Sequence, residues 1–344
     1  MTARSRTRLG VAPVPRPRLV DVAKAAGVSM MTVTRVLRDP AKVAADTRAR
    51  VERVLRKTGY TPDLVARGLA SKRSGLIGAV VPLLTNSLIA EIMQGLSDTL
   101  AMDDLHLILG ASGFSAPGEE TLVRAFLSRR VDALYLTGVI HTRETVRMLK
   151  QAAIPVVEGG NLTERPIDML VGYSNIDAGC TVTRYLLERY GPVGYVGAHP
   201  QDNDRARDRR RGYELALRRA RVKLDPALCV ETSLDIDAGA AAMAALLARR
   251  PDVRAVFCSA DAIAVGALFE CQRQGLAIPD RIAVAGFDDM PLAGQVVPPL
   301  TTLRVPRYEI GRRAGEMIRA RLARQPIEAA IVDCGFEFVA RASA

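Results

Sequence analysis

The residue types best suited to reading another molecule gather in one short stretch, from Ser29 to Arg35. The planar guanidinium of Arg35 can donate two parallel hydrogen bonds to O6 and N7 of guanine, which distinguishes one base pair from another. The methionines at positions 30 and 31 can offer only apolar contact, for instance to a thymine methyl group. Short hydroxyls suit phosphate oxygens, which fix the register of a bound protein, and three are present: Ser29, Thr32 and Thr34. This chemistry favours the major groove of duplex DNA as the target.

The surrounding pattern predicts the two helices that hold these side chains. Apolar residues recur at helical spacing over 19–26 and over 30–37, and only Gly-Val-Ser separates the two segments. Gly27 supplies the left-handed residue that a tight turn needs. The hydroxyl of Ser29 is placed to cap the second helix at its first free backbone N–H groups. The spacing therefore predicts a helix, a tight turn and a second helix.

The inward faces of these helices are apolar, which leaves Met30, Met31 and Arg35 on the outside. The residues expected to face inward are Val22, Ala23, Ala26, Val33, Val36 and Leu37. A third helical segment follows over 45–58. We therefore expect a helix-turn-helix unit over 18–60. The alternative is a small helical bundle that binds protein.

Charge is distributed unevenly along the 344 residues. Residues 1–74 contain 17 Lys/Arg and 5 Asp/Glu, whereas the remaining 270 contain 31 and 32, so the net charge of +11 belongs to the first fifth of the chain. Basic side chains gain affinity for nucleic acid by releasing the counterions condensed on it. The asymmetry predicts a phosphate-binding head on an electrically neutral body. A solvated basic face without a partner is the alternative.

Beyond Gly75 the sequence changes to apolar, strand-like runs that alternate with amphipathic helices. Continuous Val/Ile/Leu runs are typical of parallel strands covered by helices on both faces. The pattern predicts a doubly wound α/β body, large enough for two similar lobes across a cleft. The eight runs are LIGAVVP, LHLILGAS, VDALYLTG, IPVVEGG, MLVGYSN, VGYVGAH, AVFCSAD and IAVAGFDD.

The chemistry of an enzyme is not encoded in any motif that we find. No GxxxxGK[ST], GxSxG or HExxH occurs, and no GxGxxG follows a strand-like run. The five cysteines form no CxxC pair and only three histidines are present, so a metal site is not expected. Asp288 and Asp289 could act as general acid and base, but hydroxyl recognition in a ligand cleft is the favoured interpretation. We expect no enzymatic activity, no cofactor and no metal.

The location of the protein is also indicated by what the sequence lacks. No apolar run reaches the roughly 18 residues of a membrane span, and the start MTARSRTRLG has no apolar signal-peptide core. These features predict a soluble, cytoplasmic protein without a membrane partner. A periplasmic sugar-binding protein would share a two-lobed body and is the main alternative, but the basic helical head argues against it.

Several stretches together resemble the LacI family of bacterial repressors. They are DVAKAAGVSMMTVTRVL (21–37), AADTRARV (44–51), RKTGYTPDLVARGLASKRS (56–74), IGAVVPLLTNS (77–87), FCSADAIAVGALFECQRQGLAIPDRIAVAGFDDMPLAG (257–294) and PPLTTLRVP (298–306). The recognition-helix residues, IPVVE and FECQRQGLAIPD look most similar to repressors of gluconate and related sugar-acid operons. The resemblance implies a homodimer that binds near-palindromic operator DNA and whose affinity a small molecule controls.

The resemblance implies a hinge over 61–74 that becomes helical on the operator. Leu69 matches the family leucine that wedges into the minor groove and bends the DNA, and Arg67 is a further expected DNA contact. Two residues depart from the family pattern. Asp63 stands where asparagine is usual, and Gly68 lowers helix propensity. We expect a hinge helix that melts easily.

An effector site between the two lobes is also implied by the resemblance. Arg209 matches the arginine that holds a ligand's hydroxyls or carboxylate, and Asp288 matches the acid that accepts hydroxyl hydrogens. Glu158 matches another cleft-facing acid. A guanidinium fork facing carboxylate acceptors is what a polyhydroxylated acid needs. The effector is therefore expected to be gluconate-like.

Three further residues are candidates for the same site. Asn86 and Ser87 follow the strand-like run IGAVVP, and ligands bind at the carboxyl ends of strands in open α/β sheets. Asp261 matches the second member of an Asn-Asp pair in the family. The first member is Ala260 here, which removes one amide from the site.

The expected fold is α/β, with a three-helix helix-turn-helix head and a two-lobed, periplasmic-binding-protein-like, doubly wound core. The expected function is repression of genes of carbohydrate or sugar-acid metabolism under the control of a small-molecule effector. The expected boundaries are a disordered basic arm over 1–17, a DNA-binding domain over 18–60, a hinge over 61–74, lobe 1 over about 75–174 and 304–330, and lobe 2 over about 175–303 and 331–344.

Overall fold

The computed structural model describes residues 17–60, 73–84, 87–199, 201 and 203–344. The chain divides into two compact units, the head (residues 1–74) and the core (residues 75–344). The expected basic arm and most of the expected hinge lie outside the described residues. No helix in the described part of the chain is long and apolar enough to cross a membrane.

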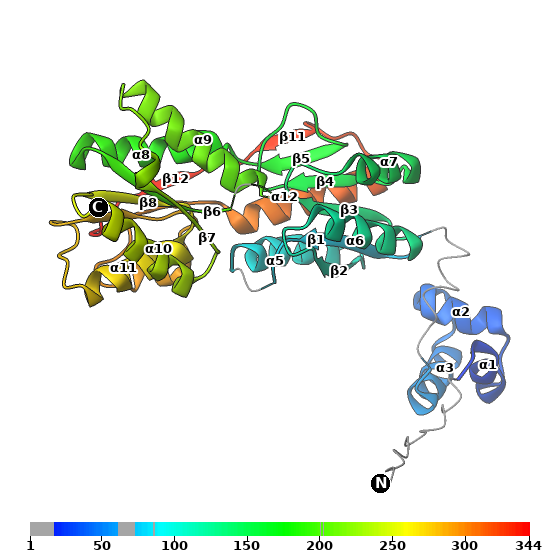
Figure 1. Ribbon diagram of the computed structural model, residues 1–344. Coiled ribbons are helices and arrows are strands. Elements are labelled where there is room, and N and C mark those ends of the chain that lie inside the picture. The colour runs from blue at the N-terminus through cyan, green and yellow to red at the C-terminus, as the bar shows by residue number, and fades with distance from the viewer. Residues whose placement is uncertain (1–16, 61–72, 85–86, 200, 202) are drawn as a thin grey trace, which may run out of the picture. The chain divides into compact units, whose positions relative to one another are not determined.

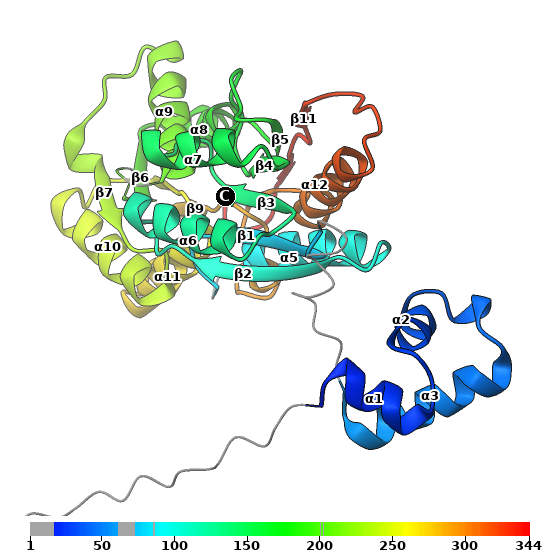
Figure 2. The ribbon, with the colours of Figure 1, turned by 90° about the vertical axis from the view of Figure 1, so that its right-hand side faces the viewer.

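Three helices in mutual contact make up the described part of the head (Figure 2). They are α1 (Leu19–Ala26), α2 (Met30–Arg38) and α3 (Ala45–Thr58), with a short 3-10 turn, η1 (Pro40–Lys42). Their bounds agree with the expected segments to within one residue. Fully buried valines from all three helices form the centre of the head: Val22, Val33 and Val51. This shared core stabilises helices that are too short to persist alone.

The turn between α1 and α2 has the geometry that the sequence predicts. Gly27 ends α1 with φ of 62°, in the left-handed region. The Oγ of Ser29 accepts a hydrogen bond of 3.1 Å from the backbone N–H of Thr32 and so caps α2. The expectation for Leu37 is wrong, because its side chain is 36% exposed while Val36 beside it is buried. Leu37 follows Val33 by one helical turn, but it lies at the edge of the core of the head, whereas Val33 lies inside it.

Six parallel strands form the sheet of lobe 1, in the order β11-β5-β4-β3-β1-β2 (Figure 1). Residues alternate between its faces: Ile77 and Val81 on β1 face a cluster with α5 and α12, whereas Val80 faces α6 and α7. The strands are β1 (Leu76–Val81), β2 (His106–Ala111), β3 (Ala133–Thr137), β4 (Val156–Gly159), β5 (Met169–Gly172) and β11 (Ile331–Asp333). The helices are α5 (Ser87–Ala101), α6 (Ala116–Ser128), α7 (Arg143–Ala152) and α12 (Arg307–Leu322).

Four parallel strands form the sheet of lobe 2, in the order β7-β6-β8-β9. Helices α8 and α9 cover one face and α10 and α11 cover the other, as the two clusters of buried side chains show. The strands are β6 (Val193–Ala198), β7 (Cys229–Thr232), β8 (Ala255–Cys258) and β9 (Ala283–Ala285). The helices are α8 (Asn175–Tyr190), α9 (Asp204–Arg219), α10 (Ile236–Arg249) and α11 (Asp261–Arg273), with 3-10 turns η2 (Pro226–Leu228) and η3 (Pro291–Gly294).

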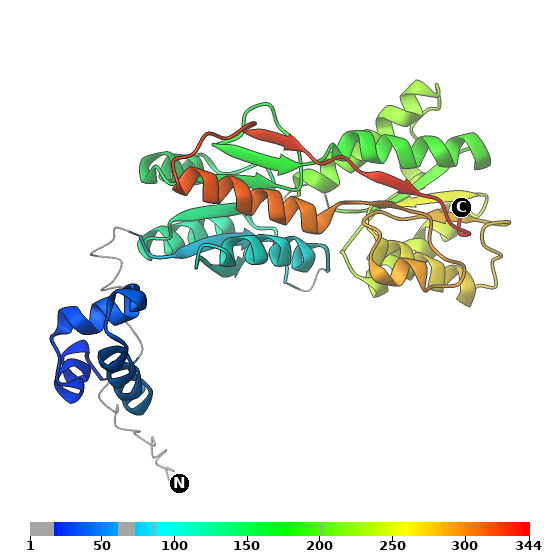
Figure 3. The ribbon, with the colours of Figure 1, turned by 180° about the vertical axis from the view of Figure 1, so that it is seen from behind.

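The chain passes between the lobes after β5, after β10 (Thr302–Arg304) and after β11 (Figure 3). Beside these crossings between the lobes, β10 pairs antiparallel with β12 (Glu337–Val339). Because Ile331–Asp333 pairs with β5, the last crossing lies a few residues later than the expected boundary at 331. All eight predicted strand runs coincide with strands, and the two-lobed α/β architecture is confirmed.

Helices α5 and α12 pack closely because glycines lie where they cross. A Cβ atom on Gly311 would overlap the carbonyl oxygen of Ile92 and approach the backbone N of Leu96 to 2.8 Å. Backbone atoms cannot move aside as a flexible side chain can, so Gly311→Ala is expected to lower the stability of the core by about 1–3 kcal/mol. Denaturant unfolding of the core measures this. Gly294→Ala, where a Cβ meets open space, is the control and should be nearly neutral.

Candidate functional site

The N-terminal half of α2 presents an exposed row of apolar and cationic side chains. Met30 and Met31 are 52% and 71% exposed, and Arg35 is exposed one turn further along the helix. Side chains of these types can meet thymine methyl groups and guanine acceptors in a major groove. The expected reading residues Met30, Met31 and Arg35 are thus on one accessible surface.

The three hydroxyls expected to contact phosphates are partly committed within α2. Ser29 Oγ caps the helix and lies 2.9 Å from Thr32 Oγ1. The hydroxyl of Thr34 donates to the carbonyl oxygen of Met30 at 2.9 Å. In this arrangement the Thr34 hydroxyl donates within its own helix, and a contact with DNA requires it to rotate toward a phosphate oxygen. The phosphate contact of Thr34 stays a prediction. Arg67 and Leu69, the expected hinge contacts, lie outside the described residues.

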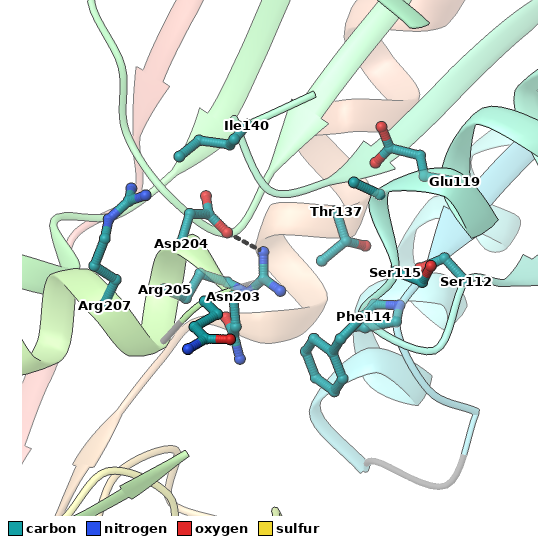
Figure 4. A pocket seen from close by; sticks show the side chains of 13 residues that line it. Ser112, Phe114, Ser115, Glu119, Thr137, Ile140, Asn203, Asp204, Arg205 and Arg207 are labelled. Atoms are coloured by element: carbon teal, nitrogen blue, oxygen red, sulfur yellow. Dashed lines mark hydrogen bonds and ion pairs between the residues drawn. The ribbon is translucent and has the colours of Figure 1, made fainter. Parts of the chain in front are cut away.

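Three adjoining cavities lie in the cleft between the two lobes of the core. Phe114 and Asn203 line all three of them. Many of the other lining residues lie at or just after the carboxyl ends of strands in both sheets, the position at which open α/β sheets bind ligands. They include Pro82, Ser112 and Thr137 from lobe 1 and Ala198, Ser259 and Asp288 from lobe 2. Figure 4 shows one of these cavities, with Ser112, Ser115 and Thr137 opposite Asn203 and Arg205.

Arg209, on α9, lies at the centre of the cleft and is only 8% exposed. Its Nε donates to Asn175 Oδ1 at 2.9 Å, Nη1 to the carbonyl oxygen of Ser259 at 2.6 Å, and Nη2 to the Tyr173 hydroxyl at 3.0 Å. The guanidinium plane stacks over the ring of Phe287, with 3.6 Å between Cζ and the ring centroid. These four contacts hold the guanidinium in place where Arg209 borders the cavity.

Asp288 lies beside Arg209, with 3.5 Å between Asp288 Oδ1 and Arg209 Nη2. Its Oδ1 is buried and has no hydrogen-bond partner among the described residues. Burial raises the pKa of Asp288 to about 6, although the charge of Arg209 lowers it. Its φ of 115° is rare for a residue with a side chain, and strain of this kind gathers at binding sites. The structure thus places Arg209 and Asp288 together on one cavity.

Asp204, at the first position of α9, links lobe 2 to lobe 1. Its Oδ2 accepts from the backbone N–H of Val139 at 2.9 Å and from Asn161 Nδ2 at 3.2 Å, and its Oδ1 accepts from Arg205 Nη1 at 2.7 Å. Burial raises the pKa of Asp204, but Arg205 and these donors outweigh burial and the pKa is lowered overall. Asp204 is therefore an ionised carboxylate on lobe 2 that accepts hydrogen bonds from lobe 1.

Two expected effector contacts, Glu158 and Asp261, are absent from the described residues that line the cavities. Glu158 is 1% exposed on β4 and accepts from the backbone N–H of Ile167. Asp261 is 1% exposed and accepts from the N–H of Met290 at 2.8 Å and the hydroxyl of Thr302 at 2.6 Å. Both carboxylates are therefore buried beneath the residues that line the cavities, and not on the cavity surface where we expected them. Asn86 lies outside the described residues, as does the side chain of Ser87.

The cleft also contains residues that the sequence analysis did not single out. Phe114 borders all three cavities, with φ of 56°, and Asn203, Glu119 and Arg205 line the cavity of Figure 4. Phe114 follows β2 just as Asn86 follows β1, so the strand-end argument applied to each run would have found it.

The pH dependence of core stability provides a test of this buried region. Burial and the nearby charge of Asp288 raise the pKa of Asp261 from 3.8 to about 7. Since the folded state then holds the proton more tightly than the unfolded state, the stability due to Asp261 is complete below about pH 4 and is lost as pH rises through 7. Asp261→Asn keeps both hydrogen bonds, with the amide oxygen accepting from Met290 and the amide nitrogen donating to Thr302.

The Asp261→Asn variant is therefore expected to show a smaller fall in Tm than the wild type as pH rises over this range. Differential scanning calorimetry at a series of pH values measures the difference. The exposed Asp280→Asn variant is the charge-matched control and should follow the wild type. Identical pH profiles for Asp261→Asn and the wild type would contradict the raised pKa.

A basic helix-turn-helix head and a two-lobed α/β core with a polar cleft define a DNA-binding regulator that senses a small molecule. Two family models match the chain: bacterial regulatory proteins, lacI family, over residues 18–63, and periplasmic binding protein-like domain over residues 184–344. The chain belongs to the lacI family of bacterial regulatory proteins. It is thus a transcriptional regulator that binds operator DNA through its head and a small-molecule effector in its core.

Relatives match over nearly their whole length. The chain is 36% identical to the HTH-type transcriptional regulator GntR of Pseudomonas aeruginosa, over 95% of this chain and 96% of that protein. It is 32% identical to the HTH-type transcriptional regulator GntR of Escherichia coli, over 93% and 96%. The crystal structure of a LacI-family regulator from Silicibacter pomeroyi matches with a TM-score of 0.88 and 31% identity, over 95% of this chain and 99% of that one. These relatives are transcriptional regulators, which are not enzymes.

Proposed function

We propose that the effector is a gluconate-like sugar acid bound in the cleft, and that it lowers operator affinity. The proposal rests on the buried guanidinium of Arg209 beside Asp288, whose Oδ1 lies 3.5 Å from Arg209 Nη2 but accepts no hydrogen bond among the described residues. A guanidinium edge suits the carboxylate of the ligand, and a carboxylate oxygen without a partner suits a hydroxyl. Hydroxyl and amide side chains continue along the cleft, as a polyhydroxylated chain requires. The resemblance of IPVVE and FECQRQGLAIPD to sugar-acid repressors supports the same ligand class.

The ligand would act by favouring one arrangement of the lobes. Asp204 joins lobe 2 to the backbone of Val139 in lobe 1, so a ligand between the lobes stabilises the closed cleft. Different affinities for the two arrangements, coupled through the dimer, would change the separation of the two heads. The half-sites of a near-palindromic operator then lie roughly 34 Å apart, one helical turn.

On this proposal the residues that contact DNA are those of α2 together with two hinge residues. Met30, Met31 and Arg35 would read bases, and the hydroxyls of Ser29, Thr32 and Thr34 would donate to phosphate oxygens. Arg67 and Leu69 would contact the DNA from the hinge, an assignment that rests on the family resemblance. Asn86 and Ser87 remain proposed effector contacts because they follow the carboxyl end of a strand in an open α/β sheet. We further propose that the protein acts in the cytoplasm, where its operators lie, and has no catalytic activity.

The proposal is tested by a thermal-shift screen of the purified protein against sugar acids and sugars. A ligand that binds only the native core raises its Tm. Gluconate or a close relative is expected to give the largest shift, with glucose as the neutral control. Fluorescence anisotropy on operator DNA should show release by the same compound. A Tm shift with neutral sugars alone would contradict the assignment of a sugar acid.

A further inference from the structure

Three buried ionisable side chains form a chain behind one wall of the cleft. His141 Nδ1 lies 2.7 Å from Glu119 Oε1, and His141 Nε2 lies 3.3 Å from Glu158 Oε1. The side chains of His141 and Glu158 are 2% exposed and that of Glu119 is 11% exposed. They come from α6, from the loop after β3 and from β4. Burying three charged groups stabilises a core poorly compared with apolar packing, so their arrangement calls for another explanation.

The chain of groups carries one net negative charge. Burial lowers the pKa of His141, but Glu119 and Glu158 on its two sides outweigh burial and raise that pKa to about 9. The imidazole is therefore protonated: it hydrogen-bonds Glu119 through Nδ1 and is ion-paired through Nε2 with Glu158, which also accepts from the N–H of Ile167. Glu119 Oε2 has no partner among the residues that the structure describes, and Glu119 borders the cavity of Figure 4. The negative charge that remains uncompensated thus faces the ligand space.

The other charges of this cavity are already matched in pairs. Arg205 Nη1 lies 2.7 Å from Asp204 Oδ1, and Arg207 Nε lies 3.4 Å from Asp208 Oδ1. The adjoining cavity is bordered by Arg209 and Asp288, whose Nη2 and Oδ1 atoms lie 3.5 Å apart. The two ends of the cleft therefore differ, with a guanidinium–carboxylate pair at one end and the carboxylate of Glu119 at the other.

We propose that Glu119 is a specificity-determining residue of the effector site, where its carboxylate accepts hydroxyl hydrogens from the non-acidic end of the effector. His141 is a positioning residue, because its Nδ1 orients the carboxylate of Glu119. Glu158 in turn orients the imidazole of His141. A ligand with a second anionic group at that end would meet a buried like charge, so the site selects monoanionic sugar acids against dianionic ones. The inference rests on the proposed function, since it places the carboxylate of a sugar acid at Arg209.

Glu119→Gln tests the inference because it keeps the size of the side chain and removes only its charge. The ligands are gluconate, glucarate with a second carboxylate, and 6-phosphogluconate with a phosphate, each titrated by calorimetry. Wild-type protein is expected to prefer gluconate, and Glu119→Gln should reduce this preference by about tenfold, the size of a hydrogen bond to a charged group. The matched control is Glu120→Gln, one residue along, whose carboxylate accepts from Thr142 outside the lined cavity. It should keep the wild-type preference.

Two further variants keep the inference testable if Glu119→Gln folds poorly. Glu119→Asp retains the charge on a shorter stem, so gluconate binding should weaken while dianions stay excluded. His141→Gln should reduce the preference for gluconate as Glu119→Gln does, and a residue that only stabilises the fold would not move this ratio.

The outcomes separate this inference from the proposed function. If gluconate binds wild-type protein and Glu119→Gln keeps the full preference, Glu119 does not determine specificity, while the sugar-acid assignment stands. If none of the three acids binds wild-type protein, the proposed function fails and the inference fails with it.

Discussion

Arg209→Ala is expected to abolish the response to effector while the protein still binds operator DNA. The guanidinium at this position holds Asn175, the Ser259 carbonyl and the Tyr173 hydroxyl and pairs with Asp288, so no other side chain can replace its N–H edge. Removing one partner of a buried charge pair also lowers stability, by about 3–5 kcal/mol. The head has its own core and should keep its affinity for operator. Operator release as a function of effector concentration, measured by fluorescence anisotropy, checks the first effect, and calorimetry checks the second.

Two companion variants separate loss of the ligand contact from loss of fold. Arg209→Lys keeps the positive charge but not the planar fork, and should respond only at much higher effector concentration. Arg211→Ala removes an arginine from the same helix whose side chain is 58% exposed and pairs with Asp208. It should respond as the wild type does. Release of operator from Arg209→Ala at wild-type effector concentrations would refute the placement of the effector in this cleft.

The head could be predicted almost completely from the sequence, and the physical reason is local. Its helices are set by signals within a few residues of each boundary, namely apolar spacing, the left-handed Gly27 and the Ser29 cap. Leu37 was predicted wrongly because helical spacing defines a direction and not how far the core extends. In the core, long apolar runs identified the central strands for the same local reason.

Four short strands, β7, β10, β11 and β12, were not predicted, because partners far away in the chain create them. Cys229–Thr232 has no apolar run and becomes β7 by pairing with β6. Ile331–Asp333 pairs with β5, about 160 residues earlier, and thereby moves a boundary between the lobes. The residues of β7 and β11 alone do not indicate that β6 and β5 are their partners. The register of such edge strands is set by pairing with the neighbouring strand in the folded sheet.

The cleft was predictable in outline, but the direction of individual side chains was not. Arg209 and Asp288, far apart in sequence, meet on one cavity, as the family resemblance implied. Glu158 was expected there too, but alternation along β4 puts it on the face of Val156, beneath α6 and α7, where it meets His141. The partner of Glu158 lies on another element, so only the folded structure reveals that Glu119 is the carboxylate on the cavity.

Asp204 and the Asp288 region connect the cleft to the rest of the core. Asp289, next to Asp288, pairs with Arg304 and Arg341 at 2.7 Å, and its carbonyl oxygen accepts from Arg307 at the start of α12. Because helix α12 belongs to lobe 1, Asp289 lies on a segment with contacts in both lobes. On the proposed function, we expect a ligand at Asp288 to change the relative position of the lobes through this segment.

Arg35→Ala is expected to reduce specific operator affinity by about 1–3 kcal/mol for each half-site, the size of one bidentate contact to guanine. Because a dimer carries two heads, the loss counts twice on a symmetric operator. Arg35 is exposed on α2 and outside the buried core of the head, so the Tm of the head should not change. Anisotropy titrations against operators with each base pair substituted should show that discrimination relaxes at one position per half-site. Arg50→Ala, an exposed arginine on α3, removes the same charge and should weaken binding equally for all sequences. Equal losses on specific and random DNA for both variants would show that Arg35 contacts phosphates and not bases.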